Sequence, residues 1–137
     1  MKARIEWLRD LTFVGESGSG HAVVMAASAG AAATAPSPME YVLLGTGGCT
    51  AVDVVLILEK GRHDVRGCEV TLDADRAEID PKVFTKIRFH FKGAGKGLKR
   101  EVVERAIKLS AEKYCSASAM IGKTAEITHD FEIVEAA

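Results

Sequence analysis

The residues with the clearest capacity for chemistry are two of the three cysteines. Cys49 follows a run of glycines within Leu44–Thr50, and Cys115 lies within Glu112–Ser116. Two thiols that meet in space can run a redox cycle. One thiolate attacks a peroxide oxygen and becomes a sulfenic acid, and the second condenses with it to a disulfide. A disulfide requires Cα atoms within roughly 7 Å, so the pair is a candidate site only if the fold brings the two segments together.

Such a cycle needs an activated thiol. An ordinary cysteine has a pKa of about 8.5, so only about 3% of it is thiolate near neutral pH. The helix dipole would help Cys49 little, because that effect fades within the first turn and Cys49 lies about three turns into the helix predicted below. A cation from another segment is therefore required. The alternative interpretation is that Cys49 is a small buried hydrophobe with no chemical role.

The segment that holds Cys49 is predicted to be a long helix. Ser37 can cap it, Pro38 suits the first helical position, and Glu40 completes a capping box. Tyr41–Leu58 is apolar or small apart from Asp53, so the helix must be buried on several sides. It is expected to end near Lys60-Gly61, where a cation precedes a glycine.

The glycines of this helix require a structural or functional explanation, since each weakens a helix by about 1 kcal/mol. Close approach of another backbone and room for a substrate are the two candidates. The glycines, together with the charge of Asp53, also argue against a membrane span.

Alternation of apolar and polar residues predicts strands on both sides of this helix. The expected strands are Lys2–Trp7 and His21–Ala27, with a turn at Gly15–Gly20 between them, and then Cys68–Asp75, Thr85–Lys92 and Thr124–Val134. The Cys68–Asp75 and Thr85–Lys92 strands are expected to pair antiparallel with one face solvated. The remaining segments are a small-residue loop at Ala29–Pro36, a connection at Gly93–Gly97, a second helix at Lys99–Tyr114 and a short turn at Ser118–Gly122. This order predicts an α+β fold in a single domain over residues 1–137.

The composition of the chain argues against several classes of function. The chain has 137 residues, of which 47% are hydrophobic and 27% charged, which is typical of one soluble domain and not of disorder. A net charge of −1 without a basic cluster argues against nucleic acid or a membrane as partner. An odd number of cysteines and the lack of an apolar leader favour a cytoplasmic protein.

The other candidate residues favour structural roles. Asp53 lies one helical turn after Cys49, and its negative charge would raise a thiol pKa, so a hydrogen-bonded structural role is expected. Cys68 lies on the apolar face of its strand and is expected in the core. His129 shares a face with apolar neighbours and is expected to be a satisfied buried histidine. The remaining histidines have no metal-ligand spacing, and no metal site is predicted.

Three motifs resemble those of the OsmC/Ohr family of osmotically induced and organic hydroperoxide resistance proteins, closest to its small YhfA-like branch. They are Ser37-Pro38-Met39-Glu40, Gly47–Val55 and Glu112–Ser116. The resemblance covers the whole chain. It implies an OsmC-like α+β fold with antiparallel sheets around a long buried central helix. It also implies an intertwined homodimer with its active sites at the interface.

The resemblance further implies peroxiredoxin-like, thiol-dependent reduction of organic hydroperoxides in oxidative-stress defence. By motif match, Cys49 would be the peroxidatic cysteine and Cys115 the resolving one. No metal or bound cofactor is implied, and an external dithiol reductant would return the disulfide to thiols.

This chain departs from the family pattern at the activating residues. In well-studied members a glutamate directly follows the helix proline and pairs with an arginine from an N-terminal strand, and that ion pair activates the thiolate. Here Met39 follows Pro38, and Phe13 occupies the arginine position. Glu40 and Arg9 are the nearest supporting candidates. An alternative function is therefore an OsmC-fold protein that binds an apolar small ligand without peroxidase turnover, in a pocket lined by Phe13, Met39, Tyr41 and Leu44.

Overall fold

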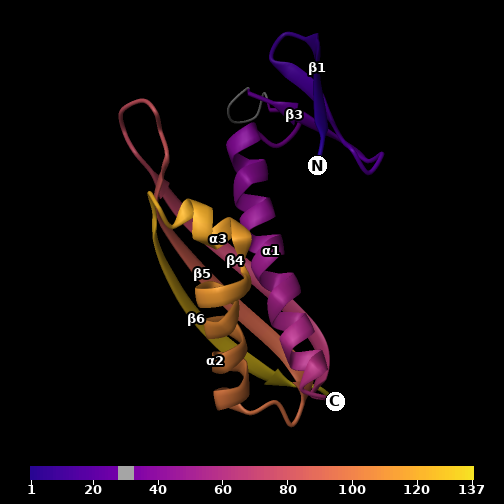
Figure 1. Ribbon diagram of the computed structural model, residues 1–137, viewed down its shortest axis with the longest axis vertical. Helices are drawn as coiled ribbons and strands as arrows, with labels where there is room; N and C mark the ends of the chain where they lie inside the picture. The colour runs from indigo at the N-terminus through magenta and orange to yellow at the C-terminus, as the bar shows by residue number, and fades with distance from the viewer. Residues whose placement is uncertain (28–32) are drawn as a thin grey trace. The chain divides into compact units, whose positions relative to one another are not determined.

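A computed structural model describes residues 1–27 and 33–137 (Figure 1). The chain divides into two compact units, Met1–Leu44 and Gly45–Ala137, and each is described by itself. Helix α1 (Pro38–Lys60) begins in the first unit and continues in the second. The loop expected at Ala29–Pro36 lies partly outside the described residues.

The first unit contains a three-stranded antiparallel sheet of order β1-β2-β3. Its strands are β1 (Ala3–Arg9), β2 (Thr12–Ser17) and β3 (Ala22–Ala26). The sequence predicted the outer strands but was wrong about Gly15, which it assigned to the turn. Gly15 is buried inside β2, where an added Cβ would lie 2.9 Å from the Met25 Cε atom. The turn is shorter and uses Gly20, whose φ is +86°.

The start of α1 has the predicted capping box. The Ser37 N–H donates to Oε1 of Glu40 at 2.9 Å, and the Glu40 N–H donates to Oγ of Ser37 at 3.2 Å. These reciprocal bonds satisfy two backbone donors that the first turn of a helix leaves without partners. The helix ends at Lys60, also as predicted.

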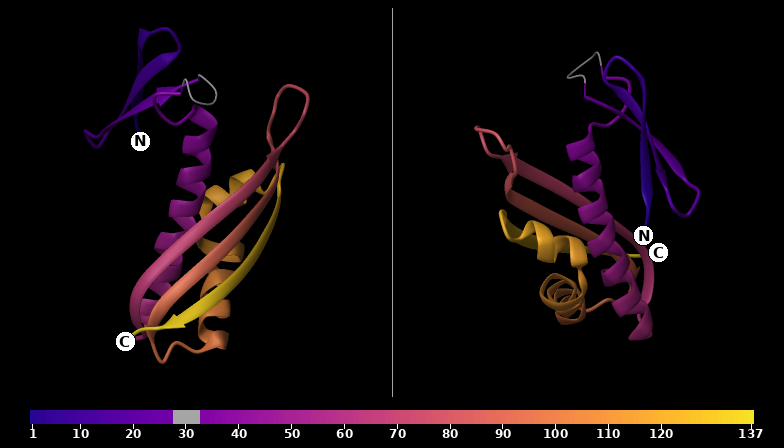
Figure 2. Two further views of the ribbon diagram at one scale, coloured as in Figure 1. Left: turned by 180° about the vertical axis from the view of Figure 1, so that it is seen from behind. Right: turned by 45° about the horizontal axis from the view of Figure 1, so that its top comes forward.

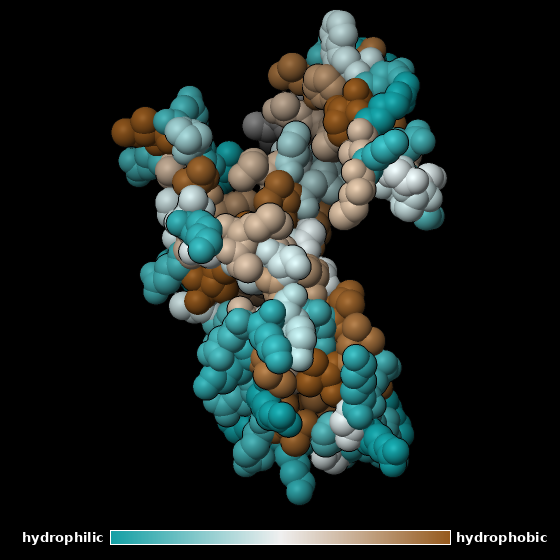
Figure 3. Space-filling model, viewed as in Figure 1, coloured by the Kyte–Doolittle hydropathy of each residue, from teal (hydrophilic) through white to brown (hydrophobic). Residues whose placement is uncertain are grey.

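Helix α1 is not buried on several sides within this chain, contrary to the sequence prediction. Its buried residues form one stripe at intervals of about one turn, namely Thr46, Gly47, Thr50, Val54 and Leu58. Other apolar side chains remain exposed, with Val52 at 58% and Leu56 at 46% of their full accessibility. Figure 3 shows hydrophobic side chains at the surface over the second half of α1. The apolar composition therefore does not reflect burial within a single chain.

By length and composition, α1 could also cross a membrane, since its most apolar window has a mean hydropathy of 1.9. The core helix of a soluble protein meets the same criterion. Here the buried stripe packs within the second unit, where a Cβ added at Gly47 would lie 2.6 Å from Cδ1 of Leu72.

The second unit contains a three-stranded sheet of order β4-β5-β6. Strands β4 (Asp64–Arg76) and β5 (Phe84–Lys96) are the predicted antiparallel pair and are longer than expected. Strand β6 (Glu126–Glu135) pairs parallel to β5, so the expectation of purely antiparallel sheets was wrong. A parallel pair needs a long crossover connection, and three helical segments supply it here.

These segments are α2 (Arg100–Leu109), a π-helical turn over Ser110–Tyr114 (η2), and α3 (Ser116–Ile121). Helix α3 occupies the position where the sequence predicted a turn at Ser118–Gly122. Figure 2 shows α2 and the second half of α1 on the same face of the sheet. The core lies between them and includes Ile87, Phe89, Phe91, Val103, Ala106 and Ile107.

The segment Gly93–Lys96 extends β5 and is not the loop that the sequence predicted. Gly95 is required there by a close approach, since an added Cβ would lie 2.1 Å from the carbonyl oxygen of Asp64 on β4. The connection to α2 begins instead at Gly97, whose φ of +65° suits glycine.

Candidate active site

Cys115 lies where two helical segments meet. The preceding η2 turn is π-helical, and the Cys115 N–H closes it by donating to the carbonyl oxygen of Ser110 at 2.8 Å. Single π-helical turns are rare and are found often at functional sites. Cys115 then turns to extended backbone and caps α3, where its sulfur accepts a hydrogen bond from the Ser118 N–H at 3.3 Å.

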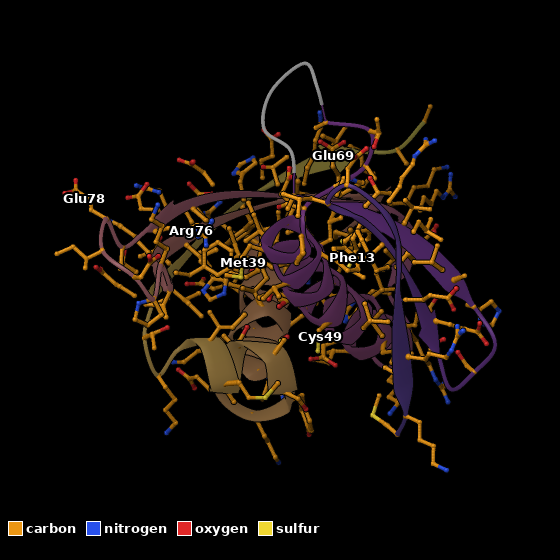
Figure 4. The ribbon with its side chains drawn as sticks, turned by 90° about the horizontal axis from the view of Figure 1, so that it is seen from above. Phe13, Met39, Cys49, Glu69, Arg76 and Glu78 are labelled. Carbon is orange, nitrogen blue, oxygen red and sulfur yellow. The ribbon has the colours of Figure 1, made fainter. Side chains whose placement is uncertain are left out.

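The fold brings Cys115 to Cys49 on helix α1. Each of the two thiols is among the groups that shift the pKa of the other, so the two side chains are neighbours, and neither cysteine is in a disulfide. Figure 4 labels Cys49 on α1. The two sequence-predicted cysteines therefore share one site in the second unit, which is the geometric condition for sulfur exchange between them.

The Cys115 sulfur is buried, with only 3% of the residue exposed. Thr50 Oγ1 lies 3.2 Å from it, and the Ser118 N–H donates a second hydrogen bond to it at 3.3 Å. Burial raises the pKa of the Cys115 thiol, but hydrogen bonds from Ser118, Thr50 and Cys49 together outweigh it. The pKa of Cys115 is consequently lowered from its ordinary value.

Cys49 is half-buried. Its pKa is shifted in the opposite direction to that of Cys115. A hydrogen bond from the Ala117 backbone lowers the pKa of its thiol. Burial, the hydrogen bond and charge of Cys115, and the charge of Asp53 raise it, and they prevail. The two thiols of the site thus have opposite shifts, since the pKa of Cys115 is lowered and the pKa of Cys49 is raised.

None of the main influences on either thiol pKa is a cation. Lys113, the nearest lysine in sequence to Cys115, has its Nζ atom 5.3 Å from the centre of the Tyr114 ring. The cation that the sequence argument required is therefore not supplied by the described residues of this unit.

The glycines beside Cys49 divide between the two roles that the sequence left open. Gly47 faces Leu72 and permits close packing. Gly45 and Gly48 have open space where a Cβ would stand, with no atom within 4 Å. The helix face next to Cys49 thus has room for another molecule.

Glu40 and Arg9, the supporting candidates, both lie in the first unit. The carboxylate of Glu40 accepts the Ser37 N–H in the capping box. Arg9 is exposed and has no ion-pair partner among residues 1–27 and 33–137. Their proposed support of Cys49 stays a prediction.

The four residues of the predicted apolar pocket also lie in the first unit. Phe13 and Met39, which are labelled in Figure 4, are half-buried, and Leu44 is exposed. The Tyr41 hydroxyl donates to the Val24 carbonyl oxygen at 2.7 Å, which ties α1 to strand β3. That these side chains line one ligand pocket stays a prediction.

Asp53 is hydrogen-bonded, as expected. Ser110 on η2 donates its hydroxyl to Oδ2 of Asp53 at 3.0 Å, so the π-helical turn is tied to α1 one helical turn beyond Cys49. This bond helps to hold Cys115 opposite Cys49.

Two structural expectations were wrong. Cys68 is exposed and does not lie in the core, because alternation identifies the face of a strand but not whether another element covers it. His129 packs on Phe89 with ring centroids 4.9 Å apart, but its Nε2 atom has no hydrogen-bond partner. In the described part of the chain no group of three His, Cys, Asp or Glu residues is placed to hold a metal ion.

Thr50 is the site residue that sequence reasoning missed. It directly follows Cys49, and adjacent residues on a helix point about 100° apart, so nothing local indicates that it contacts the second cysteine. Ser118 carried a weak signal, because a residue three positions after a helix cap is the usual donor to the capping side chain.

Comparison with known proteins assigns this chain to a family. Residues 30–130 match the family model described as OsmC-like protein. Protein YhfA of Escherichia coli K12 is 52% identical over 136 residues, covering 99% of this chain and 100% of that protein. A hypothetical protein of Aquifex aeolicus has a similar structure, with 27% identity and a TM-score of 0.88 over 99% of this chain and 97% of its own.

More distant structures share the fold. The organic hydroperoxide resistance protein OhrB of Bacillus subtilis has a TM-score of 0.63 at 16% identity, covering 96% of this chain and 98% of its own. The family-model match spans well over half of the chain, and a relative above half identity covers it from end to end. The chain therefore belongs to the family of OsmC-like proteins.

Proposed function

We propose that this protein reduces organic hydroperoxides in oxidative-stress defence, with Cys49 as the peroxidatic cysteine and Cys115 as the resolving one. The observation that carries the proposal is that two thiols from different elements of the fold are neighbours, close enough for each to shift the pKa of the other. The accessibility of the two sulfurs to a substrate supports this assignment of roles. Cys49 is half-buried and lies beside Gly45 and Gly48, where there is open space, while Cys115 is buried. The substrate class is supported by family relatives described as organic hydroperoxide resistance proteins.

The reaction has two steps within the protein. The Cys49 sulfur attacks the terminal oxygen of a hydroperoxide, the O–O bond breaks, and the alkoxide takes a proton to leave as an alcohol. The product is a sulfenic acid on Cys49. The Cys115 sulfur then attacks the Cys49 sulfur, an S–S bond forms, and hydroxide leaves and is protonated to water. An external dithiol reduces this disulfide and is itself oxidised to a disulfide.

The proposal includes a homodimer in the cytoplasm and involves neither nucleic acid nor a membrane. The exposed apolar face of α1 supports the dimer, because contiguous exposed apolar surface on a soluble protein is typical of an interaction site. No metal or bound cofactor is required by the chemistry, since both electrons come from the two sulfurs.

Steady-state turnover of cumene hydroperoxide with a dithiol reductant tests the proposal. We expect turnover by the native protein and none by Cys49→Ser. Cys68→Ser is the matched control, because Cys68 is exposed and lies outside the site, and it should retain full turnover. Absence of turnover in the native protein, or equal turnover by Cys49→Ser, contradicts the proposal.

An apolar small-ligand-binding protein of the same fold is the second candidate. The observation that favours it is the apolar character of Met39 and Phe13, which occupy the positions of a charged pair in well-studied family members. Titration of free thiols before and after a small excess of hydroperoxide separates the two functions. Loss of two thiols per chain supports the peroxidase, whereas no loss supports ligand binding.

A further inference from the structure

Resolution requires the Cys115 sulfur to face Cys49, and the neighbour of Cys49 on α1 contacts that sulfur. Thr50 is completely buried. Its Oγ1 atom lies 3.2 Å from the Cys115 sulfur and 3.1 Å from the carbonyl oxygen of Thr46. The helix that carries Cys49 therefore also carries, at the next position, a group that holds the second sulfur.

The hydrogen bonds of Thr50 fix the direction of its single hydroxyl proton. The hydroxyl donates to the carbonyl oxygen of Thr46, one turn earlier on α1. Its oxygen can then accept the S–H of Cys115, because a hydroxyl is both a donor and an acceptor. A chain of two hydrogen bonds thus connects Cys115 through Thr50 to the backbone of α1.

The Cys115 sulfur is also held by the backbone of α3. The Ser118 N–H donates to it at 3.3 Å. The contacts with Thr50 and Ser118 together restrict rotation of the Cys115 side chain. A thiol sulfur has two lone pairs, and the Ser118 N–H occupies one of them. The other is left for the neighbouring Cys49.

The backbone of Cys115 is tied to α1 one helical turn beyond Cys49. The Cys115 N–H donates to the carbonyl oxygen of Ser110 at 2.8 Å, and the Ser110 hydroxyl donates to Asp53 on α1 at 3.0 Å. This tie fixes the position of the Cys115 backbone but leaves its side chain free to turn. The direction of the sulfur depends on Thr50 and Ser118.

We propose that the Thr50 hydroxyl positions the Cys115 sulfur for resolution, so that Cys115 attacks an oxidised Cys49 before a second oxidant does. The proposal rests on the proposed function and deepens it. Two groups that are held in a reactive geometry react faster than two groups that must first find it. Because Thr50 is completely buried, it is a positioning residue that acts through Cys115 and not on the peroxide.

The step that Thr50 assists balances without a further reactant. The Cys115 sulfur forms an S–S bond with the sulfur of the Cys49 sulfenic acid, and the S–O bond of Cys49 breaks. The departing hydroxide leaves as water with the Cys115 thiol proton. The Cys115 sulfur is oxidised and the Cys49 sulfur is reduced. If this step is slow, a second peroxide converts the sulfenic acid to a sulfinic acid.

An aromatic disulfide tests the attack by Cys115 without peroxide. In a Cys68→Ser background, an equimolar amount of dithiodipyridine reacts with the half-buried Cys49, gives a mixed disulfide and releases a first thiopyridone. Cys115 then attacks the Cys49 sulfur and closes the internal disulfide. The second thiopyridone leaves with the Cys115 proton. The absorbance of thiopyridone therefore follows the two attacks as separate phases.

We expect Thr50→Val to slow the second release about fivefold, the effect of losing one hydrogen bond, and to leave the first release nearly unchanged. Alkylation of Cys49 by iodoacetamide near pH 7, followed by peptide mass, should also be nearly unchanged. Thr50→Ser restores the hydroxyl and should recover most of the lost rate. Cys115→Ser should give the first release only.

Controls separate positioning from a contribution to stability. Valine has nearly the shape of threonine, so Thr50→Val should keep the native far-ultraviolet circular dichroism. If Thr50 served only the stability of the fold, Thr50→Val would lower the free energy of unfolding and leave the ratio of the two release rates unchanged. That result overturns the proposal, as does a loss of rate that Thr50→Ser does not restore.

Peroxide chemistry is measured on the same proteins. With cumene hydroperoxide, Thr50→Val should accumulate more Cys49 sulfenic acid, trapped by dimedone, and form more sulfinic acid than the native side chain allows. A slower second release in Thr50→Val, with no consumption of cumene hydroperoxide by the native protein, would remove the proposed function but keep Thr50 as the residue that positions Cys115. Equal second releases with normal peroxide turnover would keep the peroxidase and overturn the role of Thr50.

Discussion

At the scale of single residues, the two site cysteines differ in where their hydrogen bonds come from. Cys115 is buried and still has a lowered pKa, because hydrogen bonds from Ser118, Thr50 and Cys49 exceed the cost of burial. The hydrogen bond from the Ala117 backbone lowers the pKa of Cys49, but burial, the contact and charge of Cys115 and the charge of Asp53 outweigh it, so the pKa is raised. Hydrogen bonds therefore account for the lowered pKa of the buried thiol, and no cation is among the main causes of either shift.

Asp53 gives a test of this electrostatic balance. Asp53→Asn keeps an oxygen that can accept the Ser110 hydroxyl, which now lies 3.0 Å from Oδ2, but removes the negative charge. The loss of a negative charge lowers a thiol pKa, so we expect alkylation of Cys49 near pH 7 to become about two-fold faster. Ser110→Ala is the matched control. It leaves the charge in place and should cost about 1 kcal/mol in the free energy of unfolding without accelerating alkylation.

His129 predicts a pH dependence of stability. Burial lowers its pKa from the ordinary value of 6.5. At a pH below that value the unfolded chain binds a proton that the folded chain does not, so this residue makes the free energy of unfolding fall as pH falls. His129→Leu should flatten this fall, measured by urea denaturation at several pH values from neutral to mildly acidic. An equally steep fall in the variant would exclude the prediction.

His90 is not mutated in that comparison, because its effect on the pH dependence of the free energy of unfolding is opposite to that of His129. Hydrogen bonds to Asp130 and Glu132 raise its pKa. Its stabilising contribution is therefore present at acidic pH and is lost as pH rises through the folded pKa.

At the scale of elements, the N-terminal cap of α1 is a local feature that the sequence fully determines. Ser37→Ala removes the hydroxyl that accepts the Glu40 N–H at 3.2 Å. We expect the free energy of unfolding to fall by about 1 kcal/mol, as for other N-cap serines. Glu40→Gln keeps an oxygen that can accept the Ser37 N–H, so its effect on urea denaturation should be clearly smaller. Equal losses in the two variants would show that the capping box does not act through these bonds.

The elements that the sequence predicted are those whose signals are local. The bounds of α1 follow from Ser37, Pro38 and Lys60, and the β4–β5 pair follows from strict alternation. The sequence missed β2 because Gly15 is a common turn residue, although here it sits under the Met25 side chain. It also missed the parallel pairing of β6, because the partner of a strand depends on a crossover and not on its own residues.

In the candidate site, too, features with a local sequence signal were predicted and features that depend on tertiary contacts were not. The two cysteines were predicted from their types and motifs, and the hydrogen-bonded role of Asp53 from its spacing to Cys49. The contact of Thr50 with Cys115 joins residues 65 positions apart, so only the packing of η2 on α1 reveals it. That contact is one of the causes of the lowered pKa of Cys115, so the direction of this shift could not be predicted from the sequence either.

At the scale of the whole molecule, the exposed face of α1 is the feature that a single chain leaves unexplained. Val52 and Leu56 are exposed at 58% and 46%, and Gly45 and Gly48 leave open space beside Cys49. Exposed apolar side chains on a helix cost free energy in water at about 25 cal/mol per Å². A second copy of the chain that covers this face would recover that free energy and would also enclose the half-buried Cys49.

Val52→Glu tests this explanation. A glutamate at an exposed position of a lone chain is tolerated, but at a dimer interface it would bury a charge without a partner, which is costly. We therefore expect the native protein to sediment as a dimer and Val52→Glu as a folded monomer, with hydroperoxide turnover reduced because Cys49 loses its cover. Thr71→Glu, at an exposed position on the outer face of β4, is the matched control and should remain dimeric. A native protein that sediments as a monomer, or a dimeric Val52→Glu, would require another occupant for this face of α1.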